Sequence, residues 1–180
     1  MPAQTPQARA LRRDAVRNAE RILDSAREVF GESGAEACIE EIAARAGVGV
    51  GTVYRRFASK DALMDELLRV AIEDLSAAAE LALARPDGHG LEDLLRAFGQ
   101  SFADHAGYAH LLLDRKHDPA DARRLRAAIE ELTARAAAAG TIGPGAGLGD
   151  VMTLIAAMRG LLHGPDAEST TVWPRFLDLH

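Results

Sequence analysis

Apolar residues recur at helical spacing along most of the chain. From Asp14 onward they form one stripe with a period near 3.6 residues at Val16, Ala19, Leu23, Ala26 and Phe30. Gly34 follows the stripe, and glycine commonly stands just after the end of a helix. The pattern predicts an amphipathic helix that begins near Asp14.

Two short helices are predicted next. The apolar positions Ile39, Ile42, Ala43 and Ala46 match the i, i+3, i+4, i+7 template, and Gly47 ends the pattern. After a connection of about three residues the apolar stripe resumes at Val50, Val53 and Phe57. These features indicate a helix over about 39–46 and another over about 50–57.

The rest of the chain is also expected to be helical. Ser59 is a candidate N-cap for a long helix that stops before Pro86, and Asp118-Pro119 is a further helix start. Later apolar stripes predict helices over about 91–107, 108–116, 118–139, 150–162 and 172–179. The expected fold is therefore all-α, with about nine helices and no strand.

Composition supports this class. Of the 180 residues, 36 are alanine and only 4% are aromatic, which favours helices over a β-sandwich or barrel. The single cysteine, Cys38, excludes an internal disulfide framework. The longest purely apolar run, 154–158, is far too short to span a membrane, and the N-terminus lacks the pattern of a secretory signal. We expect a cytoplasmic protein without a membrane partner.

Charge is distributed unevenly. The net charge is −6, yet residues 1–60 hold ten basic and eight acidic residues, whereas residues 61–180 hold eleven and nineteen. A slightly basic first third on an acidic body suits a protein that touches a polyanion with one end only.

The two short helices and their glycine turn have the spacing of a helix-turn-helix. The outward face of the second helix would carry Gly51, Thr52, Arg55 and Arg56. Glycine allows close backbone approach, threonine offers a methyl and a hydroxyl group, and arginine can bind guanine or phosphate. Tyr54 fits either this surface or the core, and Phe57 is assigned to the core.

The run IEEIAARAGVGVGTVYRRFASKDAL (39–63), preceded by AERILDSAREVFGESG (19–34), resembles the DNA-binding region of TetR-type transcriptional regulators. The resemblance implies that Thr52, Tyr54 and Arg55 lie at the DNA surface and that Lys60 binds a phosphate. Arg12 and Arg13 could reach the DNA from the N-terminal tail. Cys38 and Gly49 depart from the family pattern, where Ser or Thr is common, so both helix caps are weaker. Arg56 also departs from it, which leaves its role, base or phosphate contact, open.

The domains expected on this basis are a flexible basic tail (1–13), a three-helix DNA-binding domain (14–58) and a helical domain for ligand binding and dimerisation (59–180). The apolar helices near 150–162 and 172–179 would pair with a second copy. The residues nominated for a ligand pocket are Phe98, Phe102, His105, Tyr108, His110, Met152, Met158 and Arg159. Each of them could equally be an ordinary core or surface residue.

The sequence gives little indication of metal binding, phosphate binding or catalysis. His110, Asp114, His117 and Asp118 lie near helical spacing, but no HExxH motif or cysteine pair accompanies them, so no metal or other cofactor is expected. The glycines of 143–149 lack the strand and the GK[ST] motif of a phosphate loop. No GxSxG or comparable motif occurs, so we expect no enzyme.

The resulting hypothesis is a homodimeric, ligand-responsive TetR-type regulator, more specifically a repressor. It would bind a palindromic double-stranded DNA operator and a small-molecule effector. The alternative is a helical small-molecule-binding or enzymatic protein whose helix-turn-helix is purely structural. The two hypotheses differ at the outward face of 51–56, which a structural hairpin has no need to fill with Gly, Thr and paired Arg.

Overall fold

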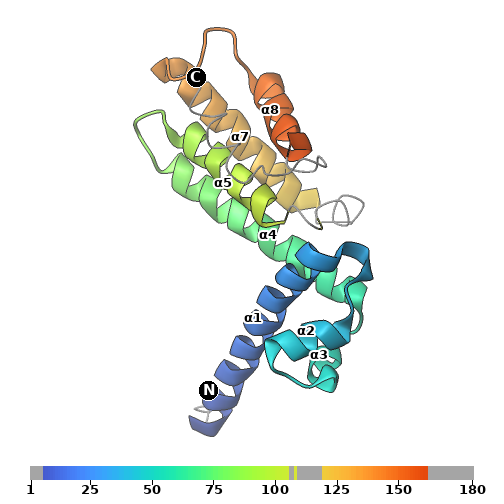
Figure 1. Cartoon of the computed structure of the whole chain (residues 1–180). Helices are drawn as coiled ribbons and strands as arrows, with labels where there is room; N and C mark the ends of the chain where they lie inside the picture. Colours follow the sequence, from blue (N-terminus) through green and yellow to red (C-terminus); the bar gives the residue numbers. More distant parts are fainter. Residues whose placement is uncertain (1–5, 106–107, 109–118, 162–180) are drawn as a thin grey trace. The chain divides into compact units, whose positions relative to one another are not determined.

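The protein is all-helical over the residues that its computed structural model describes, which are 6–105, 108 and 119–161 (Figure 1). No strand occurs within these ranges. The chain divides into two compact units, Met1–Leu67 and Leu68–His180. The predicted all-α class is confirmed.

The first unit holds one long helix, two short helices and the start of a fourth helix. Helix α1 (Pro6–Ser33) leads through a 3₁₀ turn η1 (Gly34–Glu36) into α2 (Ile39–Ala46) and α3 (Val50–Arg56), followed by the first turns of α4 (Lys60–Leu83). Each of the four α-helices buries at least one large apolar side chain completely, as Phe30, Ile42, Val53 and Leu63 show. Burial of these side chains supplies the main driving force that holds the short helices in place.

Helix α1 begins eight residues earlier than expected. Residues 6–13 were predicted to be a tail, yet they continue the helix. Pro6 occupies the first helical position, where its missing N–H costs nothing, and QARALRR consists of good helix formers. Val16, expected on the buried stripe, is 57% exposed, and Ala19 is the first buried residue from Asp14 onward, where burial is described.

The second unit is a bundle of the remainder of α4 with α5 (Gly90–Asp104), α7 (Pro119–Ala139) and α8 (Leu148–Leu161), which lie side by side in Figure 1. Its core draws on all four helices and includes Leu75, Leu94, Phe98, Ile129, Leu132 and Ile155. Gly90 lets α4 and α5 approach closely. A Cβ at this position would lie 2.3 Å from the carbonyl oxygen of Ala82.

One end of this bundle is held by polar contacts that join the α4–α5 loop to α5 and the end of α4 to α7. Arg85 binds both Asp87 and Asp93, and this hydrogen bonding lowers the pKa of Asp87 to about 2. From α7, the Nη1 of Arg135 donates to the carbonyl oxygen of Leu83 at 2.7 Å. The C-terminal end of α7 therefore lies beside the C-terminal end of α4.

Most of the expected helices are confirmed within a few residues. The predicted N-cap at Ser59 is also confirmed, because its Oγ accepts a hydrogen bond from the amide of Ala62 at 3.1 Å. The structure has seven α-helices in its described part. The helices expected near 108–116 and 172–179 fall almost entirely outside that part.

Candidate nucleic-acid interface

The turn between α2 and α3 depends on one glycine. Gly47 closes α2 in the left-handed conformation, with φ of 65°, and its amide binds the carbonyl oxygen of Ala44 at 3.1 Å. The amide of Val48 binds the carbonyl oxygen of Ala43 at 3.0 Å, which completes a glycine-capped helix end. Only glycine adopts this conformation without strain, so the chain reverses here and α3 can begin at Val50.

Helix α3 has one buried and one exposed face. Val53 and the following Phe57 are buried, whereas Tyr54 is 48% exposed. Gly51, Arg55 and Arg56 are exposed as well, and Thr52 is half-buried. The reading of Tyr54 as a core residue is therefore wrong. We name the exposed face formed by Gly51, Thr52, Tyr54, Arg55 and Arg56 the α3 face.

Two contacts order the arginines of the α3 face. The Nη2 of Arg55 donates a hydrogen bond to the Oγ1 of Thr52 at 2.9 Å. The guanidinium carbon of Arg56 lies 5.6 Å from the centre of the Phe57 ring, within cation–π range. Both guanidinium groups keep donors available because each carries five N–H groups. The face thus offers forked donors and a hydroxyl group, the groups that read base edges and bind phosphates.

Lys60 sits at the start of α4 and makes contacts within its own unit. Its Nζ donates to the carbonyl oxygen of Ala35 in η1 at 2.5 Å and lies 5.7 Å from the centre of the Phe30 ring. The sequence had indicated only a phosphate contact for this residue. Since an ammonium group has three donors, the bond to Ala35 leaves two for another acceptor.

Arg45 links α2 to α1 and was missed by sequence analysis. Its Nη1 and Nη2 bind the Oε1 and Oε2 of Glu32 at 2.6 and 2.7 Å in a two-pronged ion pair, and Glu28 and Glu41 lie within 3.7 Å. The hydrogen bond from Arg45 lowers the pKa of the Glu32 carboxyl group. No spacing rule connects residues on two crossing helices, so the sequence carried no signal for this contact.

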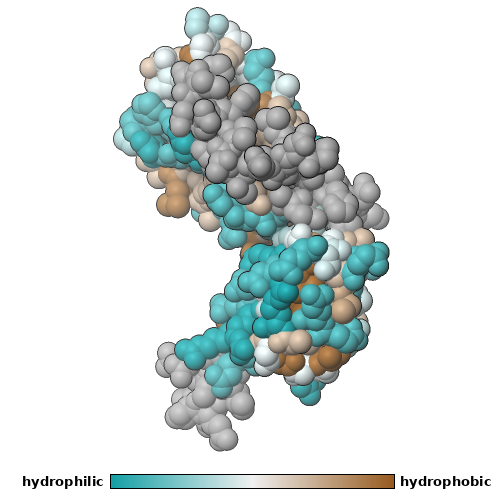
Figure 2. Space-filling model, in the orientation of Figure 1, coloured by the Kyte–Doolittle hydropathy of each residue, from teal (hydrophilic) through white to brown (hydrophobic). Residues whose placement is uncertain are grey.

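The remaining predicted positions of this unit lie within α1 or at helix N-caps. Arg12 and Arg13 lie within α1. Cys38 and Gly49 occupy the N-caps of α2 and α3 with extended backbones, and neither forms a side-chain cap bond. This agrees with the weaker caps expected from the sequence. On the face of this unit that Figure 2 shows, the described residues are mostly hydrophilic, with small apolar patches between them.

The second unit contains a largely apolar pocket of about 410 Å³ between its four helices, which we name the central pocket. Five of the residues nominated from the sequence line it, namely Phe98, Phe102, His105, Met152 and Arg159. Tyr108 and Met158 are not among the residues that line it, and both are completely buried. His110 lies outside the described residues.

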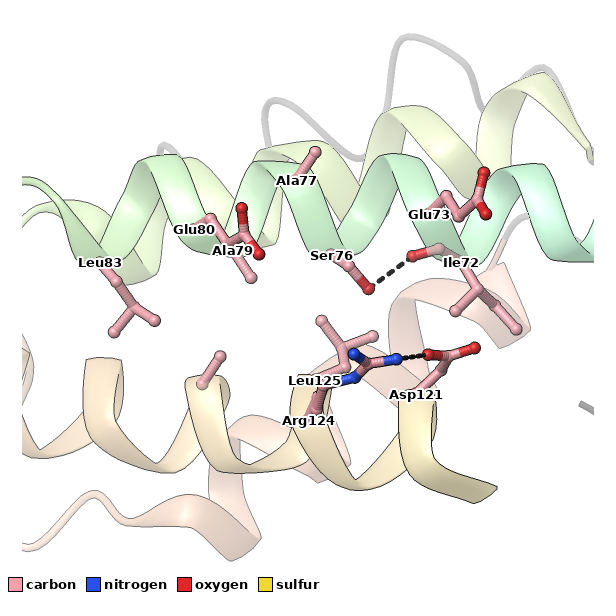
Figure 3. Close-up of a pocket in the computed structure, with 11 residues that line it drawn as sticks. Ile72, Glu73, Ser76, Ala77, Ala79, Glu80, Leu83, Asp121, Arg124 and Leu125 are labelled. Carbon is pink, nitrogen blue, oxygen red and sulfur yellow. Dashed lines mark hydrogen bonds and ion pairs between the residues drawn. The ribbon is translucent and has the colours of Figure 1, made fainter. Parts of the chain in front are cut away.

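A second pocket of about 390 Å³ runs between α4 and α7 (Figure 3). Its lining is more polar, and several of the polar groups drawn there bind partners on their own helices. The Oγ of Ser76 donates to the carbonyl oxygen of Ile72 at 2.8 Å, and Arg124 pairs with Asp121.

The described residues hold no group of three or more His, Cys, Asp or Glu side chains placed to bind a metal ion. The metal candidates His110, Asp114, His117 and Asp118 lie outside them. Over the same part of the chain, no helix combines the length and the apolar character needed to cross a bilayer.

A helix-turn-helix with an exposed, arginine-bearing second helix, together with a helical bundle, defines a DNA-binding regulator. Residues 22–67 match the family model for bacterial regulatory proteins of the tetR family. A TetR transcription regulatory protein from Mycobacterium vanbaalenii is 30% identical, with 93% of this chain and 97% of that one covered and a TM-score of 0.67. The chain belongs to the TetR family of transcriptional regulators.

Further solved structures agree. A TetR transcriptional regulator from Streptomyces coelicolor is 29% identical, with 89% of this chain and 94% of that one covered and a TM-score of 0.64. A TetR family regulator from Thermus thermophilus shares the fold at 21% identity, 88% and 92% coverage and a TM-score of 0.66. A comparison with curated proteins found no significant match.

Proposed function

We propose that this protein is a ligand-responsive, homodimeric repressor that acts in the cytoplasm, binds a palindromic operator and has no catalytic activity. The observation that carries the proposal is the α3 face, where Tyr54, Arg55 and Arg56 are exposed while Val53 of the same helix is fully buried. A purely structural hairpin has no need of such a face. This favours DNA binding over the alternative of a helical binding protein.

In the proposed complex, α3 enters the major groove of one half-site. Thr52 and Arg55 contact base edges, and Arg56 contacts either a base or a phosphate. Tyr54, Lys60 and the arginines near the N-terminus, Arg12 and Arg13, bind phosphates. Base contacts then supply sequence choice, whereas phosphate contacts supply affinity that falls with added salt.

A dimer supplies two copies of α3. Two-fold symmetry matches a palindromic operator, whose half-sites lie about 34–36 Å apart along the duplex. We propose that the C-terminal helices, from α8 onward, form the interface between the copies. This assigns DNA binding to residues 14–58 and ligand binding with dimerisation to residues 59–180.

Repression would be relieved by an effector in the central pocket. An effector shifts the equilibrium only if it binds the two conformers with different affinity. Helix α4 provides the covalent link, since its residues begin in the first unit and continue through the second. The effector-bound conformer would hold the two α3 helices at a spacing that no longer matches the operator.

The direct test is a gel shift with the DNA upstream of the protein's own coding region, because repressors commonly bind near their own genes. We expect a discrete complex that survives excess unrelated duplex. Light scattering should show two chains in solution. The test would use overlapping fragments that cover this upstream region. If the protein bound none of them more strongly than unrelated DNA, the proposal would be contradicted for this region.

A further inference from the structure

The ionisable side chains among the described residues that line the central pocket are all basic. Its lining is otherwise apolar and comes from α4, α5, α7 and α8. The exceptions are Ser101, His105, Arg126 and Arg159. No carboxylate is among the described residues that line it, although acidic residues outnumber basic ones in the chain as a whole.

The two arginines lie at a similar level of the bundle. Helices α7 and α8 pack against each other and are joined by residues 140–147. Arg126 precedes the end of α7 by 13 residues and Arg159 follows the start of α8 by 11 residues. At a rise of 1.5 Å per residue, Arg126 lies about 20 Å and Arg159 about 17 Å along the helix from the connection. We infer that both guanidinium groups lie in the same region of the pocket.

Part of the pocket lining belongs to the core of the bundle. Leu75, Phe98, Ile129 and Ile155 line the pocket and also belong to the buried apolar cluster of the bundle. Arg126 and Arg159, in contrast, are exposed. The pocket therefore has an apolar floor formed by the bundle core and a basic rim at the surface.

His105 adds a third nitrogen-bearing group at the end of α5. Its Nδ1 is hydrogen-bonded to the carbonyl oxygen of Ser101, and its ring packs edge-on against Tyr108 with centroids 5.5 Å apart. Because a carbonyl oxygen can only accept, Nδ1 carries a proton. The ring is thus fixed in orientation in the same pocket lining as the two arginines.

From these observations we propose that the central pocket binds an amphipathic organic anion, with the apolar body on the core residues and a carboxylate at Arg126 and Arg159. Guanidinium groups pair with carboxylates through charge-assisted, two-pronged hydrogen bonds. A cationic ligand would meet like charge. The volume of about 410 Å³ suits a small ligand of this kind. The assignment of this anion as the effector rests on the proposed function.

The test is direct binding of matched ten-carbon probes to the full-length protein in the absence of DNA. Decanoate, 1-decanol and decylammonium share one apolar chain and differ in the charge of the head group. Calorimetric titration below the micelle-forming range gives an affinity for each. We expect decanoate to bind about tenfold more tightly than decanol, and decylammonium to bind more weakly than either.

Variants test whether Arg126 and Arg159 cause the preference for a negatively charged head group. The double variant Arg126→Gln with Arg159→Gln should lose the preference for decanoate while it still binds decanol, which shows that the pocket remains folded. Arg123→Gln, an exposed arginine of α7 that does not line the central pocket, is the matched control and should behave as the wild type.

Three outcomes would overturn the inference: equal affinity for decanoate and decanol, no binding of decanoate, or a preference for decanoate that survives in the double variant. None of them depends on DNA. A protein that binds decanoate selectively but no operator would instead refute the proposed function and leave the pocket assignment standing.

Discussion

Arg55 and Thr52 are joined across one turn of α3, with the Nη2 of the arginine 2.9 Å from the Oγ1 of the threonine. The bond holds the guanidinium group against the exposed face of its own helix. A long side chain that is ordered before binding loses less rotational freedom when it meets a base. This pair is therefore the part of the α3 face best suited to read sequence.

Replacing Arg55 by alanine should relax the preference at one base position of the operator. The expected loss there is about 1–3 kcal/mol, the discrimination typical of a forked arginine–guanine contact. Binding titrations against operators substituted at each position measure it. If Arg55→Ala instead weakened binding to every operator by the same factor, the residue would be a phosphate contact.

Lys60→Ala should weaken binding to all sequences and reduce the slope of log affinity against log salt by about 0.9, as expected for one lost phosphate contact. The contact of Nζ with the carbonyl oxygen of Ala35 gives this substitution a second effect, a lower melting temperature. Both quantities are measured on the same sample. A lower melting temperature with an unchanged salt slope would mean that Lys60 only holds η1 to α4.

Gly51→Ala should change the stability of the protein and its affinity for the operator in opposite directions. A Cβ at this position meets no atom within 4 Å, and alanine in a helix stabilises by up to about 1 kcal/mol over glycine. The added methyl group would nevertheless stand on the α3 face and hold the backbone away from DNA. We expect a higher unfolding midpoint in urea together with weaker operator binding.

Gly47→Ala is the contrasting variant in the same turn. Its φ of 65° makes alanine unfavourable by about 1–2 kcal/mol, although the nearby end of Arg21 can move aside. This variant should unfold at lower urea. Equal stability of the two variants would contradict the account of the turn.

Cys38→Ser should stabilise the first unit by about 0.5–1 kcal/mol. The residue is exposed and holds an extended N-cap conformation at α2, and a serine Oγ can accept a bond from a free amide of the first turn. Cys38→Ala, which removes the thiol but offers no acceptor, is the control and should show no gain. Stabilisation by both substitutions would point to an effect of losing the thiol rather than to capping.

Local signals in the sequence predicted the fold well. The helix-ending Gly47, the N-cap at Ser59 and the alternation of buried and exposed positions on α3 each act over a few residues, so they can be read from the chain alone. The start of α1 was placed too late because the apolar stripe was traced only from Asp14, while the two prolines of residues 1–13 are more typical of a tail than of a helix. One of them, Pro6, instead occupies the first helical position.

Contacts between helices could not be predicted in the same way. The bond from Lys60 to Ala35 joins positions 25 residues apart, and the ion pair of Arg45 with Glu32 joins positions 13 apart, so both depend on how the helices cross. The pocket nominations have the same weakness. Aromatic and methionine residues at helical spacing serve a core as readily as a cavity, and Met158 belongs to the core.

The central claim is that the α3 face binds operator DNA, and paired arginines allow a direct measurement. Affinity for an operator fragment should fall by about five- to 150-fold, equivalent to about 1–3 kcal/mol, in the double variant Arg55→Ala with Arg56→Ala. It should be unchanged in Arg123→Ala with Arg124→Ala, an exposed adjacent pair on α7. Equal affinity of the two double variants, or a larger loss in the α7 pair, would contradict the account.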